Sequence, residues 1–147
     1  MSQASDIKDQ IKATLEALVP ATLKEVQVDD FKVSPLFDRD IAAYPCAIVT
    51  PPAIEGDYLT NRENERTHSF GVVIIEKMEN ISSANYVEDL IETILDAFDN
   101  VPTLNGKATA GSQPASTIPE PVMVRGNTGY IYFTVVIKAK SIKTLTF

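Results

Sequence analysis

The sequence predicts an α+β domain in which a largely antiparallel sheet packs with two amphipathic helices. The 147 residues fit one domain spanning residues 1–147. The apolar period changes along the chain from helix to strands, to a second helix and to strands again, and no repeat of a solenoid period interrupts this order. Helices and strands grouped in this way favour a largely antiparallel sheet.

The first expected helix covers about Asp6 to Val19. Its apolar residues recur at spacings of four, four and three, which places them on one face: Ile7, Ile11, Leu15 and Leu18. Ser5 precedes the pattern and suits an N-cap, because its hydroxyl can accept a hydrogen bond from a backbone N–H of the first turn. Pro20 ends the pattern, since it lacks the donor that a helix interior needs.

Two extended segments and a loop are expected next. Residues 24–33 alternate apolar and polar side chains, as a half-buried strand does. Residues 44–50 form an apolar run that predicts a buried strand, and Pro51-Pro52 ends it because neither proline can donate to a ladder. Residues 53–66 are polar and interrupted, with Gly56-Asp57 as a turn signal.

The most apolar strand and the second helix lie in the middle of the chain. Thr67 to Glu76 carry apolar side chains on both faces, which suggests a central strand or one covered on both sides. Ala84 to Asp99 are expected to form a helix capped by Ser82 or Ser83. Its wide apolar stripe consists of Val87, Leu90, Ile91, Ile94, Leu95 and Phe98.

The C-terminal third combines a long loop with a strand pair. Residues 101–121 are rich in proline, glycine and small polar side chains, so we expect a linker-like loop that is functional or becomes ordered on a partner. Residues 122–124 and 130–139 are expected to form a hairpin around Gly126 to Gly129. The tail, residues 141–147, alternates weakly and could pair in trans.

Charge and cysteine content exclude several classes of protein. The 13 Lys and Arg against 20 Asp and Glu give a net charge of −7, a poor footprint for wrapping nucleic acid. The one cysteine, Cys46, allows no intrachain disulfide and indicates a reducing compartment. Charges interrupt the N-terminal segment, so no signal peptide is expected. The longest uncharged apolar stretch, residues 41–54, is too short to span a bilayer. We therefore expect a soluble, cytosolic protein.

Few side chains offer chemistry. Cys46 and His68 could in principle act as nucleophile and base, but both lie in expected strands, which favours a buried thiol and an ordinary strand histidine. Glu88, Glu92 and Asp96 stack at four-residue spacing, as the carboxylates of any solvated helix face do. The sequence contains no phosphate-binding glycine motif. We expect no catalytic residue, no metal site and no cofactor.

A polar stretch of mixed charge, residues 61–66, leads directly into the strongest expected strand. It is either a solvated loop or a rim that pairs with opposite charges on a neighbouring subunit, where charge sets register more than affinity. The candidate interface residues are Asn61, Arg62, Glu63, Glu65 and Arg66, together with Arg125 in the C-terminal hairpin.

The layout of the chain resembles the tail-terminator, or tail-completion, proteins of long-tailed phages. The resemblance begins with the amphipathic helix at Ile7 to Leu18 and the Tyr-Pro-led apolar strand at Tyr44 to Thr50. An arginine-containing polar stretch then leads into a long strand at Arg62 to Ile75. A second helix at Tyr86 to Phe98 and a C-terminal strand pair at Val122 to Ala139 complete an order that covers nearly the whole chain.

The resemblance implies a structural virion assembly protein and not an enzyme. Members form a homo-oligomeric ring, usually a hexamer, that caps the finished tail tube, ends its polymerisation and offers a surface for head–tail joining. The implied partners are other copies of the chain, the tail tube protein and the head–tail connector protein. DNA would pass through the ring without specific binding, and no membrane would be contacted.

The same resemblance implies where the protein works and which segments meet its partners. It would occupy the host cytoplasm during assembly and then the virion tail at the tail–neck junction. The loops expected at residues 53–66 and 101–121 would face neighbouring rings. A cyclic ring also requires two different, complementary patches on each subunit.

Other functions stay open at this point. One is a head–tail connector or neck protein of related fold, which would bind a portal-side ring in place of the tube. Another is a small hydrolase or transferase that depends on Cys46 with His68, or on the carboxylates of the second helix. Nothing specific in the sequence supports a generic ligand-binding domain.

Overall fold

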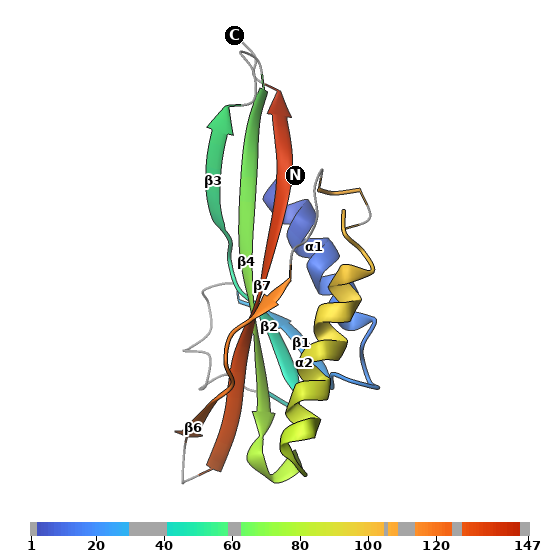
Figure 1. Cartoon of the computed structure of the whole chain (residues 1–147), viewed down its shortest axis with the longest axis vertical. Helices are drawn as coiled ribbons and strands as arrows, with labels where there is room; N and C mark the ends of the chain where they lie inside the picture. The colour runs from blue at the N-terminus through green and yellow to red at the C-terminus, as the bar shows by residue number, and fades with distance from the viewer. Residues whose placement is uncertain are drawn as a thin grey trace.

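The computed structural model describes residues 3–29, 41–58, 63–104, 106–108, 114–124 and 128–144. Figure 1 shows an elongated, twisted sheet with both helices packed on one of its faces. The elements are α1 (Gln3–Glu16), β1 (Glu25–Val28), β2 (Cys46–Val49), β3 (Ala53–Tyr58), β4 (Glu63–Lys77), the 3₁₀ turn η2 (Met78–Asn80), α2 (Ala84–Asp99), β5 (Ala115–Ser116), β6 (Glu120–Val124) and β7 (Thr128–Thr144). The α+β class is thereby confirmed.

The sheet is largely antiparallel, as expected, but it is mixed because one pair of strands is parallel. Its strand order is β1-β2-β4-β7-β5, with β3 also paired to β4 and β6 also paired to β7. β1 runs parallel to β2, whereas the other pairs are antiparallel. A parallel pair needs a crossover of about a dozen residues or more, and the segment between β1 and β2 supplies that length.

Two long strands form the axis of the sheet. β4 and β7 pair antiparallel from Glu63↔Thr144 to Lys77↔Tyr130. β4 therefore begins earlier than the strand expected from Thr67, because the polar stretch before it finds a partner strand. The expectation that residues 141–147 pair in trans is wrong for 141–144, which pair with β4 of the same chain; residues 145–147 lie outside the described part.

Most of the buried apolar side chains among the described residues lie between the sheet and the two helices. On this face, Phe70, Val72 and Ile74 of β4 join one cluster with residues from both helices. The helix residues buried in it are Ile7, Ile11 and Leu15 of α1 and Leu90, Ile94 and Phe98 of α2. The opposite face holds a smaller cluster of Cys46, Ile48, Val73 and Ile75. Both faces of β4 are thus covered by apolar contacts, as the sequence predicts.

Helix boundaries differ from the expected ones at the first helix. α1 begins at Gln3, so Ser5 lies inside the helix and is not its N-cap, and α1 ends at Glu16, before a turn that leads to Pro20. α2 spans the expected residues, but Ser83 at its N-cap position makes no side-chain capping hydrogen bond. Apolar periodicity located both helices, whereas cap signals alone did not fix their ends.

Two expected loops contain strands. Residues 53–58 form β3, so the Gly56-Asp57 turn signal is wrong, since pairing along β4 overrides the low strand propensity of Gly and Asp. Within 101–121 the structure places β5 and the start of β6, and Thr117 N bonds to Thr134 O at 2.9 Å. The expected C-terminal hairpin is confirmed by the pairing of β6 with β7. No helix among the described residues is long and apolar enough to cross a membrane.

Candidate functional site: the distal arm of the sheet

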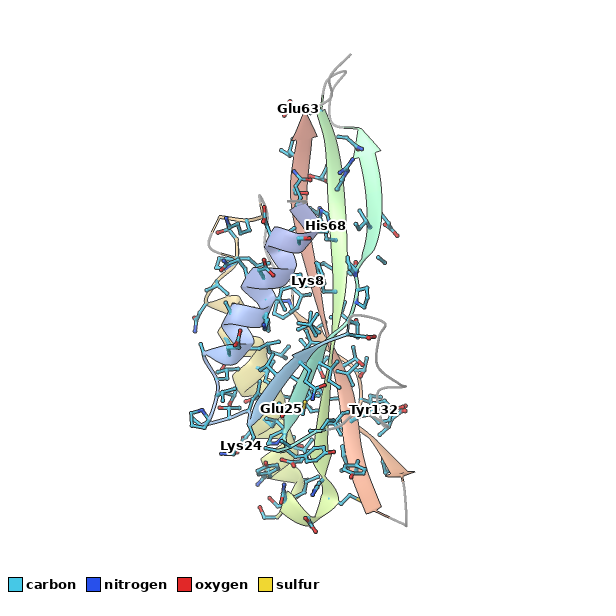
Figure 2. All side chains as sticks on the ribbon, turned by 180° about the vertical axis from the view of Figure 1, so that it is seen from behind. Lys8, Lys24, Glu25, Glu63, His68 and Tyr132 are labelled. Atoms are coloured by element: carbon cyan, nitrogen blue, oxygen red, sulfur yellow. The ribbon has the colours of Figure 1, made fainter. Side chains whose placement is uncertain are left out.

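One end of the sheet extends beyond the helices. This end, called the distal arm here, consists of β3, residues 63–70 of β4 and residues 137–144 of β7. In Figure 1 it rises past the start of α1, and Figure 2 shows the same protrusion from behind, with Glu63 near its end. The arm is therefore covered by helix only at its base, where α1 begins.

The arm contains those predicted interface residues that lie in the described part of the chain. Glu63, Glu65 and Arg66 belong to β4 and not to a loop. Because side chains alternate along a strand, Glu63 and Glu65 lie on the face away from the helices and Arg66 lies on the helix face. Asn61, Arg62 and Arg125 lie outside the described residues.

The face of the arm away from the helices carries charges of both signs. Glu65 and Lys140 form an ion pair in which Lys140 Nζ lies 3.8 Å from Glu65 Oε1. The register places Glu55 and Lys138 on the same face, beside Thr67 and Ser69 of β4. A partly exposed pair of this kind contributes at most about 1 kcal/mol to stability.

A chain of polar contacts ties the helix face of the arm to the start of α1. His68 Nε2 lies 2.9 Å from Ser141 Oγ, and Ser141 Oγ donates to Gln3 Oε1 at 3.1 Å. Gln3 Nε2 in turn donates to the backbone oxygen of Ile142 at 2.9 Å. These contacts join β4, β7 and α1, whose residues are far apart in the sequence.

Burial decides the charge state of His68. The side chain is 1% exposed, and its Nδ1 is buried without a hydrogen-bond partner in the described structure. Desolvation, and to a lesser extent the charge of Arg66, lowers the pKa of His68 below its usual value. With Ser141 Oγ donating to Gln3, the neutral ring donates from Nε2 and keeps its lone pair on Nδ1.

The enzyme hypothesis finds no assembled site in Cys46 and His68. Cys46 pairs with Ile75, seven residues along β4 from His68, which is about 20 Å of strand. The two side chains also lie on opposite faces, since Cys46 belongs to the smaller cluster. Cys46 Sγ is instead buried, 3.8 Å from Glu25 Oε2.

Sequence reasoning missed Ser141, the residue that His68 does contact. A serine beside a histidine is a nucleophile arrangement only if the hydroxyl is accessible and gives its proton to the ring. Ser141 is 3% exposed and donates to Gln3. No local signal links residues 73 positions apart, so only the strand register reveals this contact.

The carboxylates of α2 do not converge. Glu88, Glu92 and Asp96 are all exposed, and no group of three or more His, Cys, Asp or Glu among the described residues could hold a metal ion. Two shallow hollows of about 210 and 280 Å³ lie beside the helices. The larger one is lined by Ala, Thr, Leu and Val, so it offers no titratable group for a reaction.

The end of the sheet opposite the arm carries a tyrosine cluster. The rings of Tyr44 and Tyr130 are 5.4 Å apart, and Lys77 Nζ lies 5.1 Å from the centre of the Tyr44 ring. Tyr132 Oη donates to Glu120 Oε2 at 2.7 Å, and this hydrogen bond raises the pKa of Tyr132. Figure 2 shows Tyr132 far from His68 along the molecule. The cluster covers the smaller apolar face and has the contacts of a structural element.

Comparison with known proteins finds a likeness among solved structures but none among family models or curated proteins. No protein-family model matches the sequence, and no curated protein matches it. Among solved structures, the chain is similar to a chain of a structure described as "Virion of native gene transfer agent (GTA) particle". The two share 13% sequence identity with a TM-score of 0.47, over 92% of this chain and 92% of that chain.

Proposed function

We propose that this chain is a structural virion assembly protein of long-tailed phages, built as a single tail-terminator-like domain. In this proposal, copies of the chain form a ring, usually a hexamer in the family that the layout resembles. The ring caps the tail tube, ends its polymerisation and presents a surface for head–tail joining. DNA passes through the ring without specific binding.

The observation that carries the proposal is the distal arm. It protrudes beyond the helices, and the long β4–β7 pair runs through it. A ring subunit needs such a surface, because each copy must meet its neighbours through two different patches. The arm also contains residues 63–66, the described part of the polar stretch on which the resemblance partly rests.

The charges of the arm give the proposed interface its chemistry. Glu63 and Glu65 face away from the helices, on the same face as Lys140, and Arg66 faces toward the helices, so the two faces of the arm carry different sets of charges. Two chemically different faces of one arm suit a head-to-tail arrangement, in which unlike faces of successive copies meet. Rim charges of this kind set register and association rate more than affinity. Asn61, Arg62 and Arg125 remain part of the proposed interface on sequence grounds.

Charge reversal at the arm tests the proposal. The mass of the purified protein would be measured by native mass spectrometry, and tube growth would be followed after mixing with the tail tube protein. We expect a mass near six times that of the monomer, and tubes that stop growing when the protein is added. Glu65→Lys should raise by about tenfold the protein concentration at which the ring forms and at which tube growth stops, equivalent to about 1.4 kcal/mol.

Glu92→Lys is the matched control, because Glu92 is an exposed carboxylate on α2 away from the arm. It should assemble and cap as the unchanged protein does. A strict monomer that leaves tube growth unaffected contradicts the proposal. A ring that ignores the tube but binds a portal-side connector identifies the head–tail connector alternative instead.

A further inference from the structure

The edges of the sheet differ in how they are protected against pairing with another chain. A free edge strand exposes unpaired backbone groups, and proteins blunt such edges with prolines, lysines, short strands or a covering segment. β6 contains Pro121, and β5 is only two residues long and follows Pro114. β1 is four residues long. The outer edge of β7 in the arm carries Lys138, and Gln3 Nε2 already bonds the oxygen of Ile142.

β3 has fewer of these protections. Pro51-Pro52 directly precede it, but its own six residues, Ala53 to Tyr58, contain no proline and no lysine, and among the described residues they pair only with β4. In Figure 1 β3 forms the outer margin of the distal arm, on the side away from β7. The side chain of Ile54 is 51% exposed.

Hydrogen bonds of the neighbouring strands show which way the backbone groups of β3 point. Thr50 N donates to Gly71 O, so the backbone groups of Gly71 face the β2–β3 side of β4. Alternate residues of a strand face the same side, so Thr67 and Ser69 also face β3. Their register partners are Glu55 and Ala53, which must point inward.

The residues between them therefore point outward. The N–H and C=O groups of Ile54, Gly56 and Tyr58 face away from β4. Among the described residues, no hydrogen-bond partner of these three backbone positions is present. They form a row of donors and acceptors with the spacing that an added strand requires.

We infer that the outer edge of β3 is a docking site for an extended, basic segment of a partner protein, which pairs with it as an additional strand. The sequence of β3 contains two acids and no cation. When charged residues lie directly opposite each other on neighbouring strands, opposite charges stabilise the strand pair and like charges destabilise it. A segment with Lys or Arg at alternate positions would place these cations beside Glu55, and the apolar residues between them beside Ile54.

A second copy of this chain fits the edge poorly. Two β3 strands paired antiparallel would bring acids opposite acids, which destabilises a strand pair. The β5 and β6 edges carry prolines within or beside them, as described above. This docking site would give the proposed assembly role a specific place where a partner protein binds. The inference rests on that role for its biological setting, but its test does not depend on ring formation.

The test uses three seven-residue probe peptides and exchange of individual backbone amides measured by nuclear magnetic resonance. The first peptide alternates valine with lysine, the second has glutamate in place of lysine, and the third is the lysine peptide with alternate amides N-methylated. The lysine peptide should slow exchange at Ile54, Gly56 and Tyr58 by about tenfold or more at millimolar concentration. The inward amides of Ala53 and Glu55, already bonded to β4, should not change.

Ile54→Pro removes one outward donor without touching the β3–β4 ladder, so it should weaken binding of the lysine peptide by about tenfold. Ile54→Val, which keeps the donor and the branched side chain, is the matched control and should bind as the unchanged protein does. The N-methylated peptide keeps the charge but lacks the donors, so it should not slow exchange, whether or not Ile54→Pro folds.

Three results would overturn the inference. One is no slowing at the outward amides with the lysine peptide. Another is equal slowing by the N-methylated peptide, which would show charge attraction without strand pairing. A third is slowing that appears without peptide as the protein concentration rises, which would make a second copy the occupant. The native mass of the protein, measured separately, shows whether the ring forms. It therefore distinguishes a failure of the assembly proposal from a failure of this docking site.

Discussion

Replacing Ser141 by alanine tests whether the buried polar chain fixes the arm to α1. Ser141 Oγ lies 2.9 Å from His68 Nε2 and donates to Gln3 Oε1 at 3.1 Å. Nδ1 of His68 is already buried without a partner in the described structure. Ser141→Ala would therefore leave the whole imidazole buried without a hydrogen bond, while removing only one oxygen atom of volume.

The expected cost follows from that loss. Leaving a buried donor unsatisfied costs about 1–3 kcal/mol, and we expect about 2 kcal/mol here because both partners of the serine lose a contact. For a chain of this size, 1 kcal/mol corresponds to about 2–4 °C in the unfolding midpoint. Ser141→Ala should thus unfold about 4–8 °C lower.

Urea unfolding gives the free energy of unfolding, and calorimetry gives the midpoint temperature. Ser116→Ala is the control, because the Ser116 hydroxyl is bonded at an exposed position to the adjacent Thr117 oxygen; its effect should stay below about 0.5 kcal/mol. Adding His68→Leu to Ser141→Ala removes the unsatisfied donor and should recover most of the loss. Equal stability of Ser141→Ala and Ser116→Ala would refute the reasoning.

Two further predictions concern buried titratable groups. Because burial lowers the pKa of His68, the unfolded chain binds a proton at this site at a higher pH than the folded chain does. The contribution of His68 to stability is therefore full above about pH 6.5 and is lost as the pH drops toward the folded pKa. Urea unfolding across this range should show a smaller loss of stability for His68→Gln, and the same dependence of stability on pH in both proteins would contradict the prediction. Glu76 is 2% exposed and accepts hydrogen bonds from Lys77 N, Asn80 Nδ2 and Tyr86 Oη at 2.8, 2.9 and 2.5 Å. Glu76→Gln places an amide donor among these donors and should lower the free energy of unfolding by about 2 kcal/mol. The control, Glu79→Gln at an exposed position, should change it little. Equal effects of the two variants would show that the Glu76 carboxylate does not hold the start of α2.

The helices could be predicted because their signal is local. The apolar spacing of Leu90, Ile94 and Phe98 defines the buried side of α2 before any partner is known, and the structure buries these three residues. The same holds for the alternation in β4, whose two apolar faces both carry a cluster. In each case the spacing of apolar residues along the sequence matches the period of the element, 3.6 residues for the helix and 2 for the strand.

The arm could not be predicted because its signals are not local. Four of the six residues of β3 (Ala, Glu, Gly and Asp) have low strand propensity, and Gly56-Asp57 has the composition of a turn. It becomes a strand because β4 extends past β2 and offers a free ladder. The same extension turns the polar residues Glu63 to Arg66 from a loop into part of a strand.

The sequence by itself determined the α+β class, the buried sides of both helices, the central apolar strand and the C-terminal hairpin, because each follows from a short period of apolar residues or a turn signal. Only the tertiary structure decided the parallel pairing of β1 with β2, the strand β3, and the contact of His68 with Ser141 and Gln3. These depend on register between segments far apart in the chain. A shift of one residue in that register would turn every side chain of the strand to the other face.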